Sequence, residues 1–594
     1  MDFNGSSKIT KFFGTQTPEP QATRILNGLS SVDIAIDANR DGTISSRETA
    51  SQAKPFRFWI NNDSDMDANQ ESAGTIRNSD DGNINTIRDL EDMQLMKLDL
   101  PDYYYPKIQD GTYKVGFKWT NTSGGTPAVK LFRTSADISD FSYLTSVTKA
   151  AGQLMNPSTQ ISYATIQGNS VTWLPATALF APPPNPATPS NQPHPFLLFE
   201  GHERGRGKLT MVLQINGQQF DGPGVWLKLV DVKKMFDKAR GSPDSYPNPP
   251  DFTAQEPPRP GVSFNPEDMG EPFEAEPDEK NEAIILVHGW NMTDGDWQVF
   301  SSSFFKRLWW KGYRGRFYTF GWPTYNSDDD ALGFIPNHYN KSEYVAWKNG
   351  PALKMFVDGI EKRTKNIAAH SMGNVVMASA LKSGLTVNSY VAMQAALPAG
   401  CYDARDEAND YADFVAANTA DPTPDKANPD LGYRGLMAGV PTANFHNFFS
   451  VNDYALKTGT FLGGSVSWEG NEIRYKPNGW GNLYYDHDPS AAAGHRNPLW
   501  RAGNGPGGHV IARYATDHHE IMSFIARPNS EALGARVENT AGFTGFNLVT
   551  EIPQHGFGRE RTDHSGQFQR PIQKTEVFYK MLLRKMRVQF NDNN

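Results

Sequence analysis

Two kinds of hydrophobic pattern divide the chain into regions of different fold. Between residues 96 and 240 apolar and polar residues alternate with a period of two, which predicts half-buried antiparallel strands. The alternation is clearest in YKVGFKW (113–119) and in LTMVLQI (209–215). We therefore expect a β-sandwich-like domain over 96–240, closed at its end by the short segment MFDKAR (235–240).

From residue 281 onward the pattern changes to short apolar segments that precede helical patterns. The expected strands lie in AIILVHG, FYTFGW, KNIAAHS, SYVAMQAALP and FHNFFSVND. Strands that alternate with helices predict a parallel α/β sheet. The last strongly periodic segment, 574–586, is predicted to be a helix packed on that sheet. Two long insertions, 399–443 and 457–560, interrupt the pattern, and we interpret the aromatic residues of the second either as part of a cap or as that insertion's own core.

A Pro-rich and acidic stretch from 241 to 280 separates these two regions. It contains SYPNPPDF, QEPPRPG and EPFEAEPDE, a composition that cannot form a core and is typical of an extended linker. Residues 1–95 form a separate N-terminal segment with several acidic loops. The predicted order is therefore an N-terminal segment, a β domain, a linker and an α/β domain over 281–594.

Composition excludes several classes of protein. Of 594 residues 38% are hydrophobic, which is enough apolar material for large cores and excludes wholesale disorder. The formal net charge of −9 argues against a nucleic-acid binder, which usually carries a basic stripe. No apolar run approaches the roughly 18 residues that a membrane-spanning helix needs. Cys401 is the single cysteine, so an intramolecular disulfide is excluded.

The segment DANRDGTISSRE (37–48) has the spacing of a twelve-residue calcium loop, with Gly42 at the sixth position, where such a loop turns sharply. The oxygen-bearing residues at positions 1, 3, 5, 7, 9 and 12 are Asp37, Asn39, Asp41, Thr43, Ser45 and Glu48. We expect a structural calcium ion here, the alternative being a solvated turn rich in Asp and Asn. A second acidic stretch, 61–92, resembles such a loop with one residue too many, and whether it binds calcium stays open.

The calcium loop also bears on where the protein acts. Millimolar calcium is extracellular, and a cysteine-poor chain fits a bacterial secreted or periplasmic protein. The first 30 residues contain no apolar segment of the kind found in a signal peptide. We therefore expect a secreted, periplasmic or cell-surface protein whose signal peptide has been removed.

The segment AAHSMGN (368–374) follows an apolar strand and precedes a helical run, the context of a nucleophile elbow. Ser371 is the candidate nucleophile, and the small residues that such a turn needs on either side are Ala369 and Gly373. His370 is expected to point away from the nucleophile. Upstream, the strand in ILVHGWN ends in His-Gly, which predicts an oxyanion hole made by two backbone N–H groups. These belong to Trp290 and Met372.

On these residues, the region 281–590 resembles the α/β-hydrolase superfamily, and AHSMG is similar to the elbow of bacterial lipases and esterases. The whole chain resembles large secreted bacterial hydrolases in which a calcium-loop segment precedes a β domain. This wider resemblance depends on FRFWINNDSD (56–65), DDGNINTIRDL (80–90) and DHSGQF (563–568). The implied fold class is α/β: an α/β-hydrolase domain with long cap insertions, preceded by a β-sandwich-like domain and a calcium-loop segment.

The resemblance implies the chain order Ser, acid, His. Asp453 follows the apolar strand in FFSVNDYAL, where a carboxylate that orients a histidine is expected; Asp403 and Asp406 are the alternatives. His564 lies in a loop just before the last helix and is the expected general base. Its competitors are His518, His519, His555 and His509.

These residues predict a serine hydrolase that cleaves carboxylic esters through an acyl-enzyme, with a structural calcium ion and no cofactor for catalysis. The expected partner is an ester substrate, with polymeric and lipid esters both open, and no nucleic acid. Two alternatives remain: an amidase or peptidase on the same triad, and a calcium-dependent surface or carbohydrate-binding protein with an inactive hydrolase domain. The oligomeric state stays open.

Overall fold

The structure is a computed structural model, and the residues that it describes fall into two compact units, one between Val32 and Asp231 and one between Val232 and Asn591. The described ranges are 32–45, 50–62, 90–155, 162–181, 192–241, 262–264, 274, 278–324, 342, 345–361, 363–397, 440, 444–450, 453, 456, 465–469, 472–476, 483–486, 533–535, 543–551, 563–570 and 572–591.

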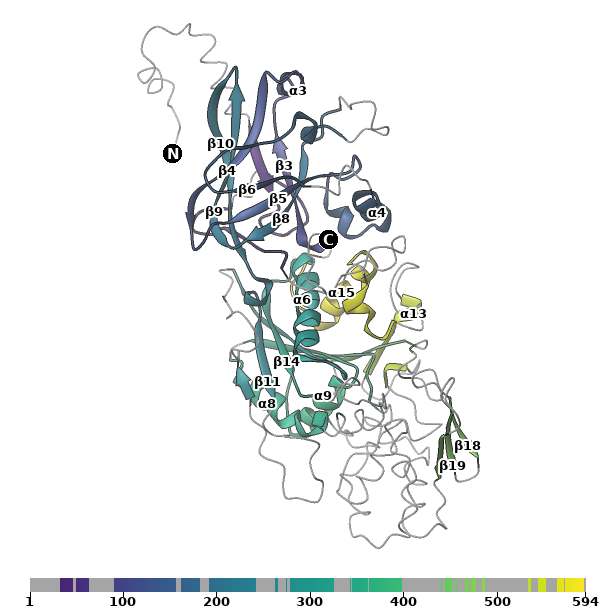
Figure 1. Cartoon of the computed structure of the whole chain (residues 1–594). Coiled ribbons are helices and arrows are strands. Elements are labelled where there is room, and N and C mark those ends of the chain that lie inside the picture. The colour runs from purple at the N-terminus through teal and green to yellow at the C-terminus, as the bar shows by residue number, and fades with distance from the viewer. Residues whose placement is uncertain are drawn as a thin grey trace. The chain divides into compact units, whose positions relative to one another are not determined.

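The first unit contains two five-stranded sheets (Figure 1). In the first sheet all neighbouring strands are antiparallel, in the spatial order β1 (Asp33–Ile36), β3 (Met93–Asp99), β8 (Phe196–Glu203), β5 (Ala128–Arg133) and β6 (Ser162–Gln167). The second has the order β2 (Phe56–Trp59), β10 (Gln218–Val230), β9 (Gly205–Ile215), β4 (Tyr113–Ser123) and β7 (Thr172–Trp173), and only its β2–β10 pair is parallel.

The period-two pattern of the sequence is confirmed in this unit. In β4 the side chains of Val115, Phe117 and Trp119 are buried, whereas Lys114 is exposed. Strands of the two sheets contact each other, so the apolar faces share a core. The unit also has short helical elements: η1 (Leu90–Asp92), α3 (Tyr104–Gln109), η2 (Phe141–Leu144), α4 (Val147–Met155) and η3 (Ala176–Leu179).

The second unit has mixed α/β content and is built on an eight-stranded sheet. Its spatial order is β12 (Val262–Phe264), β11 (Asp237–Gly241), β14 (Gly315–Gly321), β13 (Lys280–Val287), β15 (Thr364–His370), β16 (Ser389–Met393), β17 (Phe445–Phe449) and β21 (Phe543–Asn547). Seven of these strands are parallel, and only β12 runs antiparallel to its neighbour. The predicted parallel α/β sheet is therefore confirmed.

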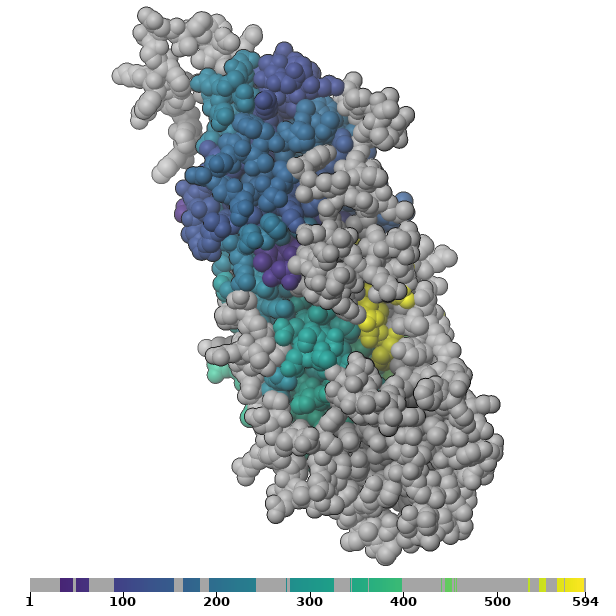
Figure 2. Space-filling model, in the orientation of Figure 1, coloured from purple at the N-terminus to yellow at the C-terminus, as the bar shows by residue number. Residues whose placement is uncertain are grey.

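Helices cover both faces of this sheet, as the continuous apolar runs of its strands require. The helices α6 (Asp294–Trp310) and α15 (Ile572–Met586) lie on one face, with α8 (Gly350–Gly359) and α9 (Gly373–Lys382) on the other (Figure 1). Within β13, Ile285 belongs to the hydrophobic cluster that also contains Leu353 of α8 and Val376 of α9. On the opposite face, the ring of Phe304 in α6 stacks on that of Phe317 in β14. Helices α6 and α15 contact each other, and their surfaces are visible side by side in Figure 2.

Three strands join this sheet from unexpected parts of the chain, and one of them, β12, lies in the predicted linker 241–280. The sequence predicts that 235–240 closes the β domain, but β11 pairs with β14 in the second unit. The predicted insertion 457–560 contains the edge strand β21, which pairs with β17 and leads into α13 (Leu548–Glu551). The same insertion also contains a separate antiparallel sheet of β18 (Ser465–Glu469), β19 (Glu472–Lys476) and β20 (Leu483–Asp486). The insertion 399–443 lies almost entirely outside the described residues.

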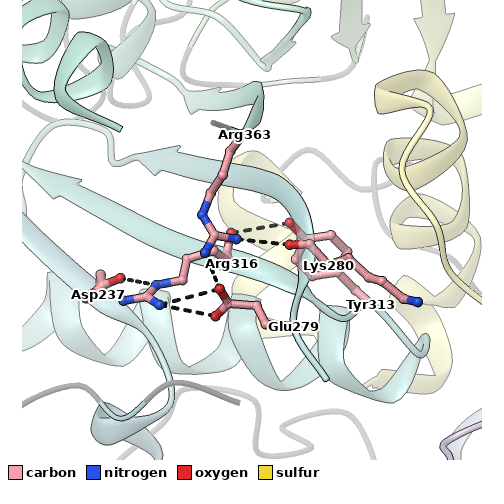
Figure 3. A network of polar contacts seen from close by, with 6 residues as sticks. All are labelled: Asp237, Glu279, Lys280, Tyr313, Arg316 and Arg363. Carbon is pink, nitrogen blue, oxygen red and sulfur yellow. Dashed lines mark hydrogen bonds and ion pairs between the residues drawn. The ribbon is translucent and has the colours of Figure 1, made fainter. Parts of the chain in front are cut away.

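An ion-pair network ties the amino-terminal ends of four neighbouring strands together (Figure 3). The buried Asp237, at the start of β11, pairs with Arg316 of β14 at 2.5 Å. Glu279, next to the start of β13, contacts both Arg316 and Arg363. The guanidinium of Arg363 also donates a hydrogen bond to the Lys280 carbonyl at 2.9 Å. The network therefore stabilises the edge of the sheet at which these four strands begin. The candidate site lies at the opposite edge, where the strands end.

Candidate active site

Ser371 lies in the sharp turn between strand β15 and helix α9. Its φ angle is 50°, a left-handed conformation that non-glycine residues rarely adopt and that stores backbone strain. The residue is 8% exposed. A serine held in a strained strand–turn–helix connection at the carboxyl end of a parallel sheet has the geometry of a nucleophile elbow.

Close packing around the turn explains the small residues on either side of Ser371. A Cβ atom on Gly373 would lie 2.4 Å from the carbonyl oxygen of His288, so a larger residue cannot fit without moving the backbone. Ala369 is completely buried at the end of β15. The requirement for small residues that the sequence indicated therefore has a physical basis in the approach of the β13 backbone to the turn.

Asn374, the fourth residue of the turn, fixes its backbone. Its side-chain amide donates hydrogen bonds to the carbonyls of Ser371 and Ala369 at 2.8 and 2.9 Å. The hydroxyl of Tyr390 in β16 donates to the Asn374 side-chain oxygen. The Ser371 N–H donates in turn to the Met393 carbonyl at 3.0 Å. Because every one of these partners is buried, the turn is held in its strained conformation from several sides.

His564 lies between Ser371 and Asp453, although the three residues are far apart in the sequence. It belongs to the short 3₁₀ turn η13 (Asp563–Ser565), just before α14 (Gly566–Gln569) and α15. Its Nε2 atom is 2.8 Å from Ser371 Oγ, and its Nδ1 atom is 2.7 Å from Asp453 Oδ2. A carboxylate only accepts, so Nδ1 carries the proton and Nε2 is free to accept from the serine hydroxyl.

Asp453 is 1% exposed and lies four residues after the end of β17. Its N–H donates to the Ser450 carbonyl at 3.1 Å, which holds the residue close to the end of the strand. A second donor to Asp453 Oδ2 is the side-chain amide of Gln394, at 3.3 Å. Gln394 is buried directly after β16 and has a φ of 44°. Gln394 is not predicted from the sequence, where its only signal is that it is the polar residue directly after the apolar run SYVAM.

The His-Gly segment after β13 is held by a buried histidine. The N–H of Trp322 donates to Nε2 of His288 at 3.0 Å, so Nδ1 carries the proton and donates to the Gly289 carbonyl at 2.8 Å. Burial lowers the pKa of His288 to about 4, so the ring is neutral near neutral pH. The indole N–H of Trp322 donates to the His288 carbonyl at 2.9 Å. These bonds fix the peptide that leads into Trp290.

This segment lies directly against the elbow. A Cβ atom on Gly289 would be 3.0 Å from Cβ of Ser371, so glycine allows the two backbones to approach. Trp290, the next residue, is half-buried and packs against the hydrophobic cluster of the sheet. Met372 is buried at the N-cap of α9. The structure thus puts the two residues of the predicted oxyanion hole on segments that flank Ser371.

The predicted calcium loop lies in the first unit and is described from Asp37 to Ser45, whereas Glu48 lies outside the described residues. Asp37 is buried, and its carboxylate accepts hydrogen bonds from the N–H groups of Asp41 and Gly42 at 3.0 and 2.8 Å. Asn39 accepts from the N–H of Asp41, and Asp41 accepts from the N–H of Thr43. Gly42 has a φ of 84°, as a sharp turn requires. The loop curls around its first carboxylate, whose two oxygens both accept hydrogen bonds from backbone N–H groups.

Several other predicted residues fall on parts of the chain that the structure does not describe. They are the alternative acids Asp403 and Asp406, the competing bases His509, His518, His519 and His555, and most of the second acidic stretch at 61–92. Among the described residues, no group of three or more His, Cys, Asp and Glu side chains is arranged to bind a metal. None of the described helices has the length and apolar character needed to cross a membrane.

Comparisons with known proteins found no matching family model, no matching curated protein and no matching solved structure.

Proposed function

We propose that the chain is a serine hydrolase that cleaves carboxylic esters through an acyl-enzyme. The observation that supports this proposal is the continuous hydrogen-bonded series from Ser371 Oγ through His564 to Asp453 Oδ2, with both distances below 3 Å. The spatial order nucleophile, base, acid meets the requirements of acyl transfer by a serine, and the chain order nucleophile, acid, base is the one expected for an α/β-hydrolase.

The proposed reaction follows from the protonation states. His564 Nε2 takes the hydroxyl proton of Ser371 while Oγ attacks the ester carbonyl carbon. The buried carboxylate of Asp453 holds the tautomer and stabilises the imidazolium that forms. When the C–O bond to the alcohol breaks, His564 returns the proton to the leaving oxygen. Water then attacks the acyl-enzyme with the same base, which releases the carboxylic acid and regenerates Ser371.

The oxyanion of the tetrahedral intermediate needs two donors next to Ser371, and we propose the backbone N–H groups of Trp290 and Met372. Met372 is at the amino-terminal end of α9, where the helix dipole favours negative charge. His288 holds the Gly289 carbonyl, which fixes the peptide that carries the Trp290 N–H. The helix and the His288 hydrogen bond would thus hold the two donors in position before the charge develops.

The second unit is accordingly proposed to have the α/β-hydrolase fold with cap insertions, and the first unit to be a β-sandwich-like domain with a structural calcium ion. Asp37, Asn39, Asp41, Thr43 and Glu48 are the proposed calcium ligands. The calcium loop further supports a secreted or cell-surface location. We propose esters as substrates because the AHSMG elbow most resembles that of esterases and lipases.

A fluorophosphonate probe tests the proposal directly, since it reacts only with an activated serine. The parent protein should be labelled, and Ser371→Ala should not be labelled and should have a kcat lower by roughly 10⁴–10⁶. Labelling that persists in Ser371→Ala would contradict the assignment of the nucleophile. Absence of labelling in the folded parent would favour an inactive hydrolase domain.

A matched panel of p-nitrophenyl esters and p-nitroanilides tests the substrate class. The esters should be cleaved, and the anilides with the same acyl group should not be cleaved measurably. Measurable cleavage of the anilides would indicate an amidase or peptidase on the same three residues, because such enzymes also cleave the more reactive esters.

A further inference from the structure

A second histidine lies against the backbone of the proposed base. The Nε2 atom of His370 is 2.9 Å from the carbonyl oxygen of His564, and the two ring centroids are 5.0 Å apart. The His370 ring also packs edge-to-face against the ring of Phe568, with the centroids 5.1 Å apart. His370 is only 3% exposed, so its ring is almost completely shielded from solvent.

The hydrogen bond defines the chemical state of His370. A carbonyl oxygen only accepts, so Nε2 of His370 carries a proton and donates it to this bond. Burial, followed by the nearby His564, lowers the pKa of His370 well below its usual value. His370 is therefore a neutral donor at neutral pH and adds no positive charge next to the imidazolium that forms on His564 during the reaction.

The hydrogen bond from His370 to His564 bears on the proposed site because His370 is next to Ser371 in the chain. His370 is the last residue of β15 and immediately precedes Ser371, so its backbone moves with the nucleophile. Its side chain holds the backbone of the base. His370 is thus joined to Ser371 through the main chain and to the backbone of His564 through its side chain.

Other contacts hold the turn after His564 but act further along the chain. The guanidinium of Arg307 in α6 donates to the carbonyls of Gln567 and Arg570. The Tyr579 hydroxyl donates to the Gln567 carbonyl at 2.8 Å. These bonds fix α14 as a whole, whereas the bond from His370 acts on His564 itself.

We propose that His370 is a positioning residue of the hydrolase, which sets the distance and angle between His564 and Ser371 by donating a hydrogen bond to the His564 carbonyl. The inference depends on the proposed function for its effect on catalysis, although the contact itself does not. A displacement of about 1 Å between reacting groups is sufficient to lower a rate by about 10²-fold.

Two substitutions separate the hydrogen bond from the packing of the ring. His370→Phe keeps a ring against Phe568 but removes the donor, whereas in His370→Gln the side-chain amide takes the place of Nε2–H. On a small p-nitrophenyl ester, we expect His370→Phe to lower kcat by about 10- to 100-fold with KM changed less than about threefold. His370→Gln should keep kcat within about fivefold of the parent.

His446→Phe is the matched control. His446 is also a buried histidine of the same sheet, in β17, and its neighbours are Lys585 and Arg587. This variant should keep kcat within about twofold. If His370→Phe does not fold, as judged by circular dichroism, the comparison of His370→Gln with His370→Asn replaces it, because the shorter Asn amide does not reach the His564 carbonyl.

A readout that does not require activity is the downfield proton NMR resonance of the Nδ1–H of His564 bonded to Asp453. We expect this resonance in the parent, in His370→Gln and in Ser371→Ala, and its loss or broadening in His370→Phe. Parent-like kcat together with an unchanged resonance in folded His370→Phe would overturn the inference. So would equal losses of kcat in the Phe and Gln variants with the resonance unchanged in both. Failure of the proposed function is distinguishable, because it appears as parent-like activity in Ser371→Ala.

Discussion

Three residues around the candidate site adopt positive φ angles although none is a glycine. Asn291 follows β13 with a φ of 61°, Ser371 follows β15 with 50°, and Gln394 follows β16 with 44°. Such conformations cost about 1–3 kcal/mol each and persist only where the surroundings hold them. At Ser371 the hydrogen bonds of Asn374 provide that support, and at Gln394 the contact with Asp453 does. The backbone strain is therefore concentrated at residues of the turns that follow the strands around the candidate site.

Buried histidines make the stability of the second unit depend on pH, and His288 is one of them. The pKa of His288 is about 4 in the folded chain, compared with about 6.5 for an exposed histidine. Between these values the unfolded chain binds a proton that the folded chain does not, so the free energy of unfolding falls as the pH is lowered through this window. From pH 7 to pH 5 the loss should be about 2 kcal/mol from His288 alone.

Urea unfolding at pH 7 and pH 5, followed by tryptophan fluorescence, measures this loss. His288→Asn is the control, because its amide does not titrate and can still donate to the Gly289 carbonyl. The variant should lose less stability than the parent over the same interval. An identical pH dependence in parent and variant would show that other groups are responsible. Burial also lowers the pKa of His370 and of His446, which act in the same direction.

At the scale of the elements, the parallel sheet separates stability from the proposed chemistry. Apart from His564, the residues of the candidate site follow the carboxyl ends of β13, β15, β16 and β17, whereas the ion-pair network lies at the amino ends of the strands (Figure 3). Parallel strands bring residues from distant parts of the chain to one edge because every strand ends there. Changes at the opposite edge should therefore affect folding and leave the arrangement at Ser371 intact.

Arg316→Ala tests this separation. It removes the charged partner of Asp237, a carboxylate that is completely buried, and should destabilise the second unit by about 3 kcal/mol. The control Lys354→Ala breaks the exposed Lys354–Asp358 pair of α8 and should change stability by less than about 1 kcal/mol. Urea unfolding gives both values, and kcat at a temperature where Arg316→Ala is folded should stay within about threefold of the parent. Equal stability changes in the two variants would contradict the assignment.

At the scale of the whole molecule, the two compact units divide the proposed roles between calcium binding and catalysis. A ligand present at 100 times its Kd adds about 2.7 kcal/mol to the stability of the unit that binds it. Calorimetry should show that chelation lowers the Tm of the first unit, while kcat on a small ester stays nearly unchanged. Asp41→Ala should have the same effect without chelation, and Asp221→Ala, which changes an exposed carboxylate of the same unit, should not.

Two outcomes would contradict the calcium proposal. An unchanged transition of the first unit after chelation would show that the loop at 37–48 holds no structural ion. Loss of ester hydrolysis in a protein that stays fully folded after chelation would instead place a metal near Ser371.

Local patterns in the sequence determined the elements and the candidate residues with the strongest chemistry. Period-two alternation is a property of adjacent residues, and it predicted strands such as β4. Apolar strands followed by helical patterns predicted the parallel sheet. The turn at Ser371 could be expected because the small residues Ala369 and Gly373 are required within five positions of sequence. His564 and Asp453 came from chain order, and the structure brings both to Ser371.

Contacts between distant segments were decided only by the tertiary structure. A short strand such as β11 carries no local signal for the sheet that it joins, because pairing depends on partners far along the chain. The same reason applies to β21 inside the predicted insertion. Gln394 and His370 look like ordinary polar residues at strand ends. Their contacts with Asp453 and His564 arise because the ends of the parallel strands and the turn before α14 lie together at one edge of the sheet. No spacing of residues in the sequence predicts these contacts.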